Sequence, residues 1–222
     1  MKVFTRILLS VAALAGVLPA SAQYYQLANQ LPGLIRPALT GGINYKGFVE
    51  ATYLKGIGNH NVDILGVSTS QGFKYADWFF MGVGIGADVL FSHVDNDFGN
   101  WQNPDYNYVE HGSTATGVMI PIFTDFRFNT GSMKTVSFYA DIKVGCSFLV
   151  GNDYLRVSNG YLTNSEYFFL RPSIGVRIPV NETGKQAFNV GIDYQLLTCN
   201  YWNSWNNSAT LNALGAAVSY EW

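Results

Sequence analysis

Five residues whose side chains can bind metals lie within one short stretch of the sequence: His93, Asp95, Asp97, Glu110 and His111. Imidazoles and carboxylates are common ligands of zinc and calcium, but these positions follow neither the spacing of zinc motifs nor that of an EF-hand loop. We therefore interpret them as solvated residues of a loop. The sequence predicts no metal site.

A second stretch, residues 82–87, loosely matches the glycine-rich fingerprint of dinucleotide-binding proteins through Gly82, Gly84 and Ala87. That fingerprint requires a turn from a strand into a helix, because the helix N-terminus must meet the pyrophosphate. Here apolar residues recur at every second position, which is typical of one continuous strand. We expect no nucleotide and no other cofactor.

The composition indicates a chain that contacts a non-aqueous medium. Of the 222 residues, 48% are hydrophobic and only 13% are charged, whereas soluble domains carry about a quarter charged residues. The hydrophobic content excludes a disordered chain, and a formal net charge of −2 provides no basic surface for nucleic acid. Two cysteines are too few for a disulfide framework or a four-cysteine zinc site. A large β domain or a membrane protein remains.

The N-terminus indicates export from the cytoplasm. Residues 1–22 combine a positively charged start, an apolar stretch and an Ala20-Ser21-Ala22 cleavage site, which predicts a secretory signal peptide. The apolar stretch is shorter than the ~20 residues that a spanning helix requires. Residues 23–42 are expected to form a periplasmic segment, either an interfacial helix interrupted by Pro32 and Pro37 or a flexible leader.

Apolar residues alternate with small or polar ones along the remaining chain. In residues 78–91 every odd-numbered position from Phe79 is apolar, while the even positions include three glycines and Asp88. A strand with this pattern exposes its two faces to different media. The pattern predicts eight strands, over residues 44–54, 62–74, 79–91, 116–128, 138–148, 168–178, 188–196 and 213–222.

Charged residues of both signs lie on the polar face of these strands. They are Lys46, Glu50, Asp88, Asp125, Arg127, Asp141, Lys143, Arg171, Arg177, Asp193 and Glu221. We expect them to form a charge network inside a barrel, paired because an isolated buried ion costs several kcal/mol. Neighbours on one face predict the pairs Lys46–Glu50, Asp125–Arg127 and Asp141–Lys143.

The expected barrel has little free space. The interior of an eight-stranded barrel is just wide enough for its own side chains. We therefore predict a salt-bridged plug and no standing channel, with room on one wall at Gly82, Gly84 and Gly86.

Aromatic residues and connection lengths favour a lipid-facing wall. Tyr45, Phe91, Phe138 and Trp222 are among many aromatic residues near the strand ends on the apolar face, where headgroups would lie. Short turns alternate with three long connections, which is typical of an outer-membrane barrel with both termini in the periplasm. The fold class predicted is an all-β, eight-stranded antiparallel up-and-down transmembrane barrel over residues 43–222.

Five segments carry a family resemblance: residues 45–50, 68–73, 79–86, 120–127 and 218–222. They resemble the small eight-stranded outer-membrane proteins of Gram-negative bacteria, the OmpA/OmpX-like superfamily and the porin-family barrel domains of Bacteroidetes. The resemblance implies contact with outer-membrane lipids and lipopolysaccharide. It also implies that Val218, Tyr220 and Trp222 form the signal read by the barrel-assembly machinery.

The predicted function is a structural or surface-interaction role. Aromatic side chains in the long connections suit stacking on an extracellular sugar or contact with a protein, although they could equally extend the interfacial belt or pack the loops together. The candidate contacts are Trp101, Tyr106, Tyr108, Tyr201, Trp202 and Trp205.

Two other functions compete with this one. The first is a small pore for ions or solutes. The second is a lipid A-modifying enzyme, because outer-membrane lipid A acyltransferases resemble this architecture and use His, Asp and Ser near the outer rim. His93, Asp95 and Ser113 occupy comparable positions, but no motif defines their geometry, and we expect no enzymatic activity.

Overall fold

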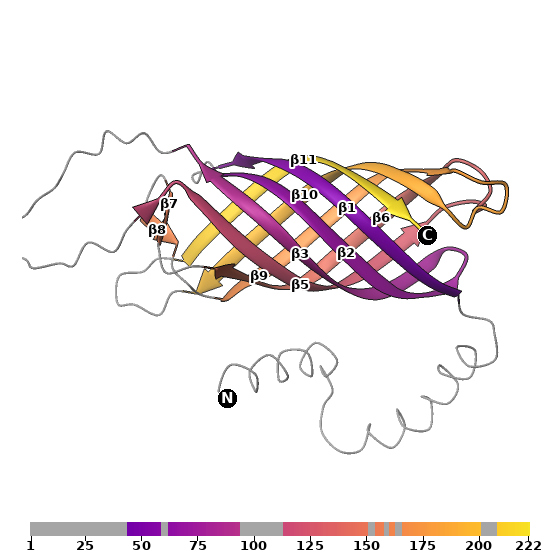
Figure 1. Cartoon of the computed structure of the whole chain (residues 1–222), viewed down its shortest axis with the longest axis horizontal. Helices are drawn as coiled ribbons and strands as arrows, with labels where there is room; N and C mark the ends of the chain where they lie inside the picture. Colours follow the sequence, from indigo (N-terminus) through magenta and orange to yellow (C-terminus); the bar gives the residue numbers. More distant parts are fainter. Residues whose placement is uncertain are drawn as a thin grey trace, which may run out of the picture. The chain divides into compact units, whose positions relative to one another are not determined.

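The computed structural model describes residues 44–58, 62–93, 113–150, 154–157, 160–162, 166–200 and 208–222. Eight long strands form one closed antiparallel barrel (Figure 1). They are β1 (Asn44–Ile57), β2 (Val62–Ala76), β3 (Phe79–Ser92), β5 (Thr116–Asn129), β6 (Ser137–Val150), β9 (Glu166–Pro179), β10 (Ala187–Asn200) and β11 (Ser208–Glu221). The predicted fold class is confirmed. The signal peptide of residues 1–22 and the segment of residues 23–42 lie outside the described residues.

The barrel has a simple up-and-down topology. Each of the eight strands pairs with the next one along the chain, and β11 pairs with β1 to close the sheet. Within the barrel no strand edge is left unpaired, because closure pairs the first strand with the last. Among the described residues, no helix is long and apolar enough to cross a membrane.

The two ends of the barrel differ in their connections. The short turns after β2, β5 and β9 lie at one end, here called the turn end, where β1 also begins and the chain terminates (Figure 1). Gly131 and Gly184 adopt positive φ angles of 84° and 67° in two of these turns, a conformation that favours glycine. The longer connections lie at the opposite end, here called the loop end.

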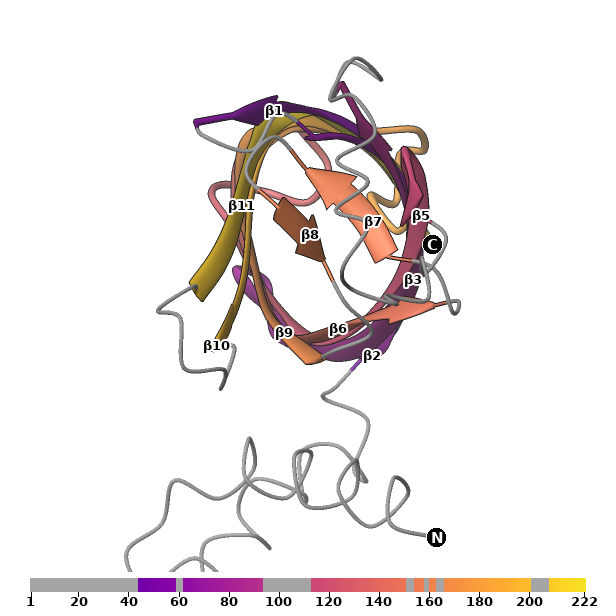
Figure 2. The same ribbon diagram turned by 90° about the vertical axis from the view of Figure 1, so that its left-hand side faces the viewer.

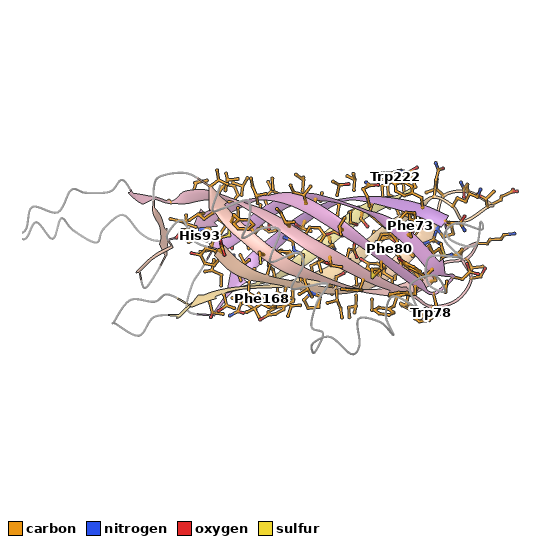
Figure 3. The ribbon with its side chains drawn as sticks, turned by 90° about the horizontal axis from the view of Figure 1, so that it is seen from below. Phe73, Trp78, Phe80, His93, Phe168 and Trp222 are labelled. Carbon is orange, nitrogen blue, oxygen red and sulfur yellow. The ribbon has the colours of Figure 1, made fainter. Side chains whose placement is uncertain are left out.

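The alternation in the sequence corresponds to the two faces of the wall. Outward side chains such as Val83, Phe138 and Ile174 are 65–70% exposed, whereas the inward-facing Asp88 is fully buried. Aromatic residues lie at both ends of the wall, with Trp78 and Trp222 near the turn end and Phe168 towards the loop end (Figure 3). The wall therefore has an apolar surface of the kind that faces lipid.

A small second sheet lies at the loop end, where the sequence predicted only loops. Strands β4 (Ser113–Thr114), β7 (Tyr154–Val157) and β8 (Gly160–Leu162) form it in the order β4-β7-β8. Figure 2 shows β7 and β8 across the barrel opening. The prediction of loops was wrong here, because strands of two to four residues are too short to show an alternating pattern.

An apolar cluster fills the barrel towards the loop end. Its members are Leu54, Val62, Ile64, Leu90, Met119, Phe123, Leu149, Leu155, Tyr167, Phe169, Leu197, Leu211 and Ala213. All except Leu155, which belongs to β7, come from barrel strands near the loop end. The lumen is therefore not only a salt-bridged plug, because part of it is a conventional hydrophobic core.

Candidate functional site

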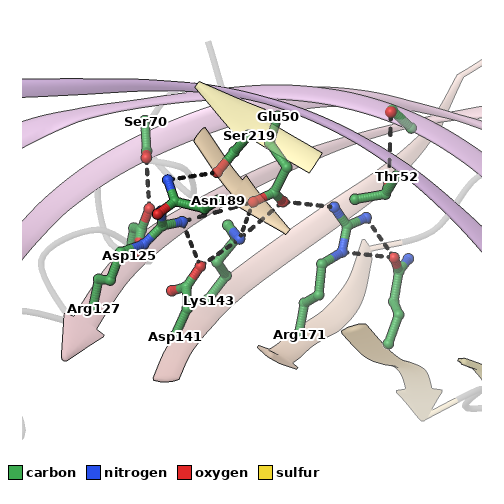
Figure 4. Close-up of polar contacts among 12 residues, drawn as sticks. Glu50, Thr52, Ser70, Asp125, Arg127, Asp141, Lys143, Arg171, Asn189 and Ser219 are labelled. Atoms are coloured by element: carbon green, nitrogen blue, oxygen red, sulfur yellow. Dashed lines mark hydrogen bonds and ion pairs between the residues drawn. The ribbon is translucent and has the colours of Figure 1, made fainter. Parts of the chain in front are cut away.

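The candidate site is the buried charge network in the middle of the barrel (Figure 4). Arg127 on β5 and Asp141 on β6 lie directly opposite each other in the sheet, and Arg127 Nη2 is 2.9 Å from Asp141 Oδ2. Lys143 Nζ lies 2.7 Å from the same Asp141 oxygen and 2.9 Å from Glu50 Oε1 on β1. Glu50 reaches β6 from a strand that is not its neighbour, so these ion pairs span the lumen.

Arg171 on β9 extends the network towards the apolar cluster. Its Nη2 donates a hydrogen bond to Asp88 Oδ2 on β3 at 2.7 Å, and its Nε donates to Gln195 Oε1 on β10 at 2.9 Å. The guanidinium also lies 5.0 Å from the ring centroid of Phe169, a member of the apolar cluster. Arg171 thus joins the ionic and the apolar parts of the lumen.

A further group of ion pairs lies at the turn end of the barrel. Arg177 Nε lies 2.8 Å from Glu221 Oε2, and Lys46 Nζ lies 2.5 Å from Glu221 Oε1. Arg177 also donates hydrogen bonds to the backbone carbonyls of Met133 at 2.8 Å and Gly184 at 2.7 Å. One guanidinium therefore ties the β5–β6 and β9–β10 turns to the inner wall.

Aromatic rings occupy the space beside inward-facing glycines. A Cβ at Gly175 would lie 2.7 Å from Tyr139 Cε1, and the same ring covers Gly191. Phe80 and Phe123 cover Gly82 and Gly84 in the same way. The glycines of β3 therefore leave no room on that wall, contrary to expectation, because rings fill the space beside Gly82 and Gly84, and Ser68 and Pro121 fill the space beside Gly86.

All eleven predicted lumen charges are buried side chains of the barrel strands. Their partners differ from those expected. Lys46 pairs with Glu221 and not with Glu50, and Arg127 pairs with Asp141 and not with Asp125, whereas Asp141–Lys143 is present. Residues two apart on a strand are separated by about 6.6 Å of rise, so a directly opposed residue or one across the lumen is closer.

Two carboxylates have few partners. Asp125 accepts a hydrogen bond from Ser70 Oγ at 2.5 Å through Oδ2 only. Asp193 is fully buried, and among the described residues neither of its carboxylate oxygens has a hydrogen-bond partner. The described residues therefore provide no hydrogen bond to the Asp193 carboxylate.

A polar cluster at the loop end was missed by the sequence analysis. Asp63 on β2 accepts hydrogen bonds from the Tyr53 hydroxyl at 3.2 Å and the Gly56 amide at 3.0 Å, and it lies 2.8 Å from His93 Nε2. Lys55 Nζ is 3.9 Å from the same carboxylate. Asp63 falls on the apolar face of its strand, and that break in the alternation is the signal that could have identified it.

The remaining predicted site residues are placed only in part. Val218 and Trp222 lie on the exposed outer wall, and the Trp222 ring stacks on Tyr220 with centroids 6.3 Å apart. The six aromatic loop residues, Trp101, Tyr106, Tyr108, Tyr201, Trp202 and Trp205, lie outside the described residues, as do Asp95, Asp97, Glu110 and His111. Within the described ranges, no group of three or more potential ligands could hold a metal ion.

Two solved structures are similar to this barrel. Neisserial surface protein A matches 81% of this chain and 97% of its own, with a TM-score of 0.51 and 9% sequence identity. The chain has the fold of a small outer-membrane β-barrel. The outer-membrane enzyme PagL matches 78% of this chain and 97% of its own, with a TM-score of 0.47 and 12% identity.

Sequence comparison does not assign the chain to a family within this fold. No protein-family model and no curated protein sequence matches the chain. The resemblance to small outer-membrane barrels is thus supported by structure, whereas the OmpA/OmpX-like and Bacteroidetes assignments are not.

The prediction that the chain has no enzymatic activity was wrong as stated. An outer-membrane enzyme is among the similar structures. That similarity alone assigns no activity to this chain.

Proposed function

We propose that this protein is an integral outer-membrane barrel that holds its long connections at the cell surface for contact with an extracellular sugar or protein. In this orientation the short turns and the termini are periplasmic. The observation that carries the proposal is the filled lumen inside an apolar wall, which makes the barrel a rigid scaffold. Lipids and lipopolysaccharide contact the wall, and the barrel-assembly machinery reads Val218, Tyr220 and Trp222.

Membrane insertion and orientation can be tested together. The folded barrel is expected in the outer-membrane fraction and should migrate differently on a gel when the sample is not boiled. Protease added to intact cells should cleave within residues 94–112 or 201–207 and leave the turns after β5 and β9 uncut. Cleavage in those turns would reverse the proposed orientation.

The ligand-binding role rests on the aromatic residues of the long connections. Cells that display the protein are applied to an array of immobilised glycans and to immobilised host-surface proteins. The double variant Trp101→Ser/Tyr106→Ser should lose at least tenfold in retention, while Tyr75→Ser on the outer wall near the turn end serves as the matched control. Equal retention of all three proteins would contradict the proposal.

A pore is the competing function that the lumen argues against. The side chains of Arg127, Asp141, Lys143 and Arg171 are at most 2% exposed. Glu50 on β1 and Asp88 on β3 hold Lys143 and Arg171 from across the lumen. Conduction would require these ion pairs to separate, which costs several kcal/mol in a buried setting. Purified protein in planar bilayers should show no discrete openings. Discrete openings of stable size would overturn the plugged barrel.

A second candidate function is lipid modification at the loop end, favoured by the contact between His93 and Asp63. When a carboxylate accepts a hydrogen bond from one N–H group of a neutral imidazole, the other ring nitrogen is unprotonated and can act as a base. The His93 side chain is 49% exposed, so this nitrogen is accessible. The grouping of His93 with Asp95 and Ser113 stays a hypothesis, because Asp95 and the side chain of Ser113 lie outside the described residues.

Mass spectrometry of lipid A tests this second candidate. Cells with the wild-type protein are compared with cells that carry His93→Ala, Asp63→Asn or the turn-end control Glu182→Gln, at an exposed position of the turn after β9. Enzymatic activity predicts a change in acyl content that both rim variants abolish and the control retains. Identical lipid A in all strains would refute it.

A further inference from the structure

A hollow of about 570 Å³ lies at the turn end of the barrel. Residues of β1, all three short turns and the C-terminus line it, and they include Lys46, Lys74, Asp77, Lys134, Lys185 and Trp222. It is separate from the long connections and from the charge network in the middle of the lumen. The proposed surface-interaction role does not involve this hollow.

The hollow is strongly cationic in a chain whose formal net charge is −2. Four of its lining residues are lysines, against one aspartate. Two of the lysines are already paired, Lys46 with Glu221 at 2.5 Å and Lys74 with Asp77 at 2.6 Å. The lining therefore keeps an excess of positive charge.

Lys134 and Lys185 supply that excess. Both are exposed residues of different turns, and within the described ranges no carboxylate lies within 4.0 Å of either ammonium group. The turns that carry them are held in place, because Arg177 donates hydrogen bonds to the carbonyls of Met133 and Gly184, the immediate neighbours of the two lysines. The two lysines are thus carried by neighbouring turns, both of which line the hollow.

Aromatic residues connect the hollow to the membrane surface. Tyr45 and Trp222 line it from the outer face of the wall and are 58% and 38% exposed. Tyrosine and tryptophan at the ends of membrane-spanning elements sit at the level of the lipid headgroups. The hollow therefore opens where phosphate groups of the adjacent leaflet lie.

We propose that this hollow binds the phosphate of an anionic phospholipid from the leaflet that the turns face. Lys134 and Lys185 contact the phosphate, and Tyr45 and Trp222 contact the glycerol and upper acyl region. The inference rests on the proposed membrane insertion of the barrel but on none of its loop contacts. A lipid is favoured over free phosphate because the aromatic side chains add apolar contact that a free ion cannot use.

Native mass spectrometry of the full chain in neutral detergent micelles tests the site. Dioctanoyl phosphatidylglycerol is titrated against dioctanoyl phosphatidylcholine, with sodium phosphate as a third probe. Near-surface lysines each strengthen binding to anionic lipid by about fivefold, so Lys134→Gln/Lys185→Gln should weaken phosphatidylglycerol binding roughly 25-fold. Lys55→Gln, which removes an exposed ammonium group at the loop end, should leave it unchanged.

The outcomes separate this site from the proposed function. Equal binding of the two lipids, or equal loss in both variants, would overturn the site. Binding of sodium phosphate as tight as that of phosphatidylglycerol would overturn the assignment to a lipid. Migration of unboiled samples is measured in parallel. If the protein folds normally but binds the two lipids equally, the lipid site is refuted and the proposed function stands. If the protein never forms a barrel, both the lipid site and the proposed function are refuted.

Discussion

The lumen is filled by ions in its middle and turn-end parts and by apolar side chains towards the loop end. Arg127, Asp141 and Lys143 hold the ionic part through contacts of 2.7–2.9 Å. In the apolar part, Leu90 and Leu197 are equally buried, and their aliphatic side chains can form neither ion pairs nor hydrogen bonds. Leu155 of β7 adds to this part from outside the barrel strands.

The difference concerns what each part requires of the fold. A buried charge stabilises the fold only when an opposite charge lies within about 4 Å, because otherwise the cost of desolvation exceeds the electrostatic attraction. An apolar cluster requires only suitable volume and tolerates rearrangement. The ionic part should therefore be the more sensitive to single substitutions, and it specifies strand register more strictly, because a one-residue slip would move every charge to the lipid face.

The largest expected effect is the loss of a central cation. Arg127→Met should lower the free energy of unfolding by about 3–5 kcal/mol, because Asp141 and Glu50 lose a buried partner. Urea unfolding of the barrel in phospholipid vesicles measures this. Lys55→Met, at an exposed position of the loop end, is the control and should change stability by less than about 0.5 kcal/mol.

A cavity in the apolar part should lower the free energy of unfolding somewhat less than the loss of Arg127. Leu90→Ala is expected to lower the free energy of unfolding by about 3 kcal/mol, and the volume-conserving Leu90→Met by under about 1.5 kcal/mol. The same urea experiment applies, repeated at high salt, which should leave both values unchanged. A greater loss for Leu90→Ala than for Arg127→Met would reverse the comparison between the two parts.

Neutralising a charge should have opposite effects at two positions of the ionic part. Asp193→Asn should raise stability by about 1 kcal/mol, because the described residues provide no hydrogen bond to its buried carboxylate. Asp141→Asn should lower stability, because Lys143 and Arg127 both contact this carboxylate. Destabilisation by Asp193→Asn would show that attraction from Lys143 and Arg171 outweighs the missing hydrogen bonds.

The smallest effect concerns the turn after β2. A hydrogen bond from Lys74 lowers the pKa of Asp77 below its ordinary value of 3.8. The contribution of the Lys74–Asp77 ion pair to the free energy of unfolding is therefore complete above about pH 4 and is lost as the pH falls through the lowered pKa of Asp77. Because the Asp77 side chain is 88% exposed, solvent screening limits it to a few tenths of a kcal/mol. Unfolding midpoints of Asp77→Asn and wild type should differ slightly at pH 7 and converge as the pH falls below the lowered pKa of Asp77.

Local patterns were sufficient to predict the barrel. The alternation in residues 78–91 assigns β3 and its two faces without reference to any other strand, and the weaker pattern of residues 62–74 still placed Leu65 and Val67 on the exposed face. The pairing of ions was less predictable. Glu50 and Lys143 are 93 residues apart in the sequence and meet only across the closed lumen.

The amino-acid sequence by itself determined the eight strands, the medium that each face contacts and the set of charges that lie inside. These depend on side-chain polarity at a period of two, which is a local property of each strand. Only the tertiary structure decided which charges pair, how rings fill the space beside glycines, and that Asp63 meets His93. These contacts depend on register, closure and barrel width, which bring together residues that no local pattern relates.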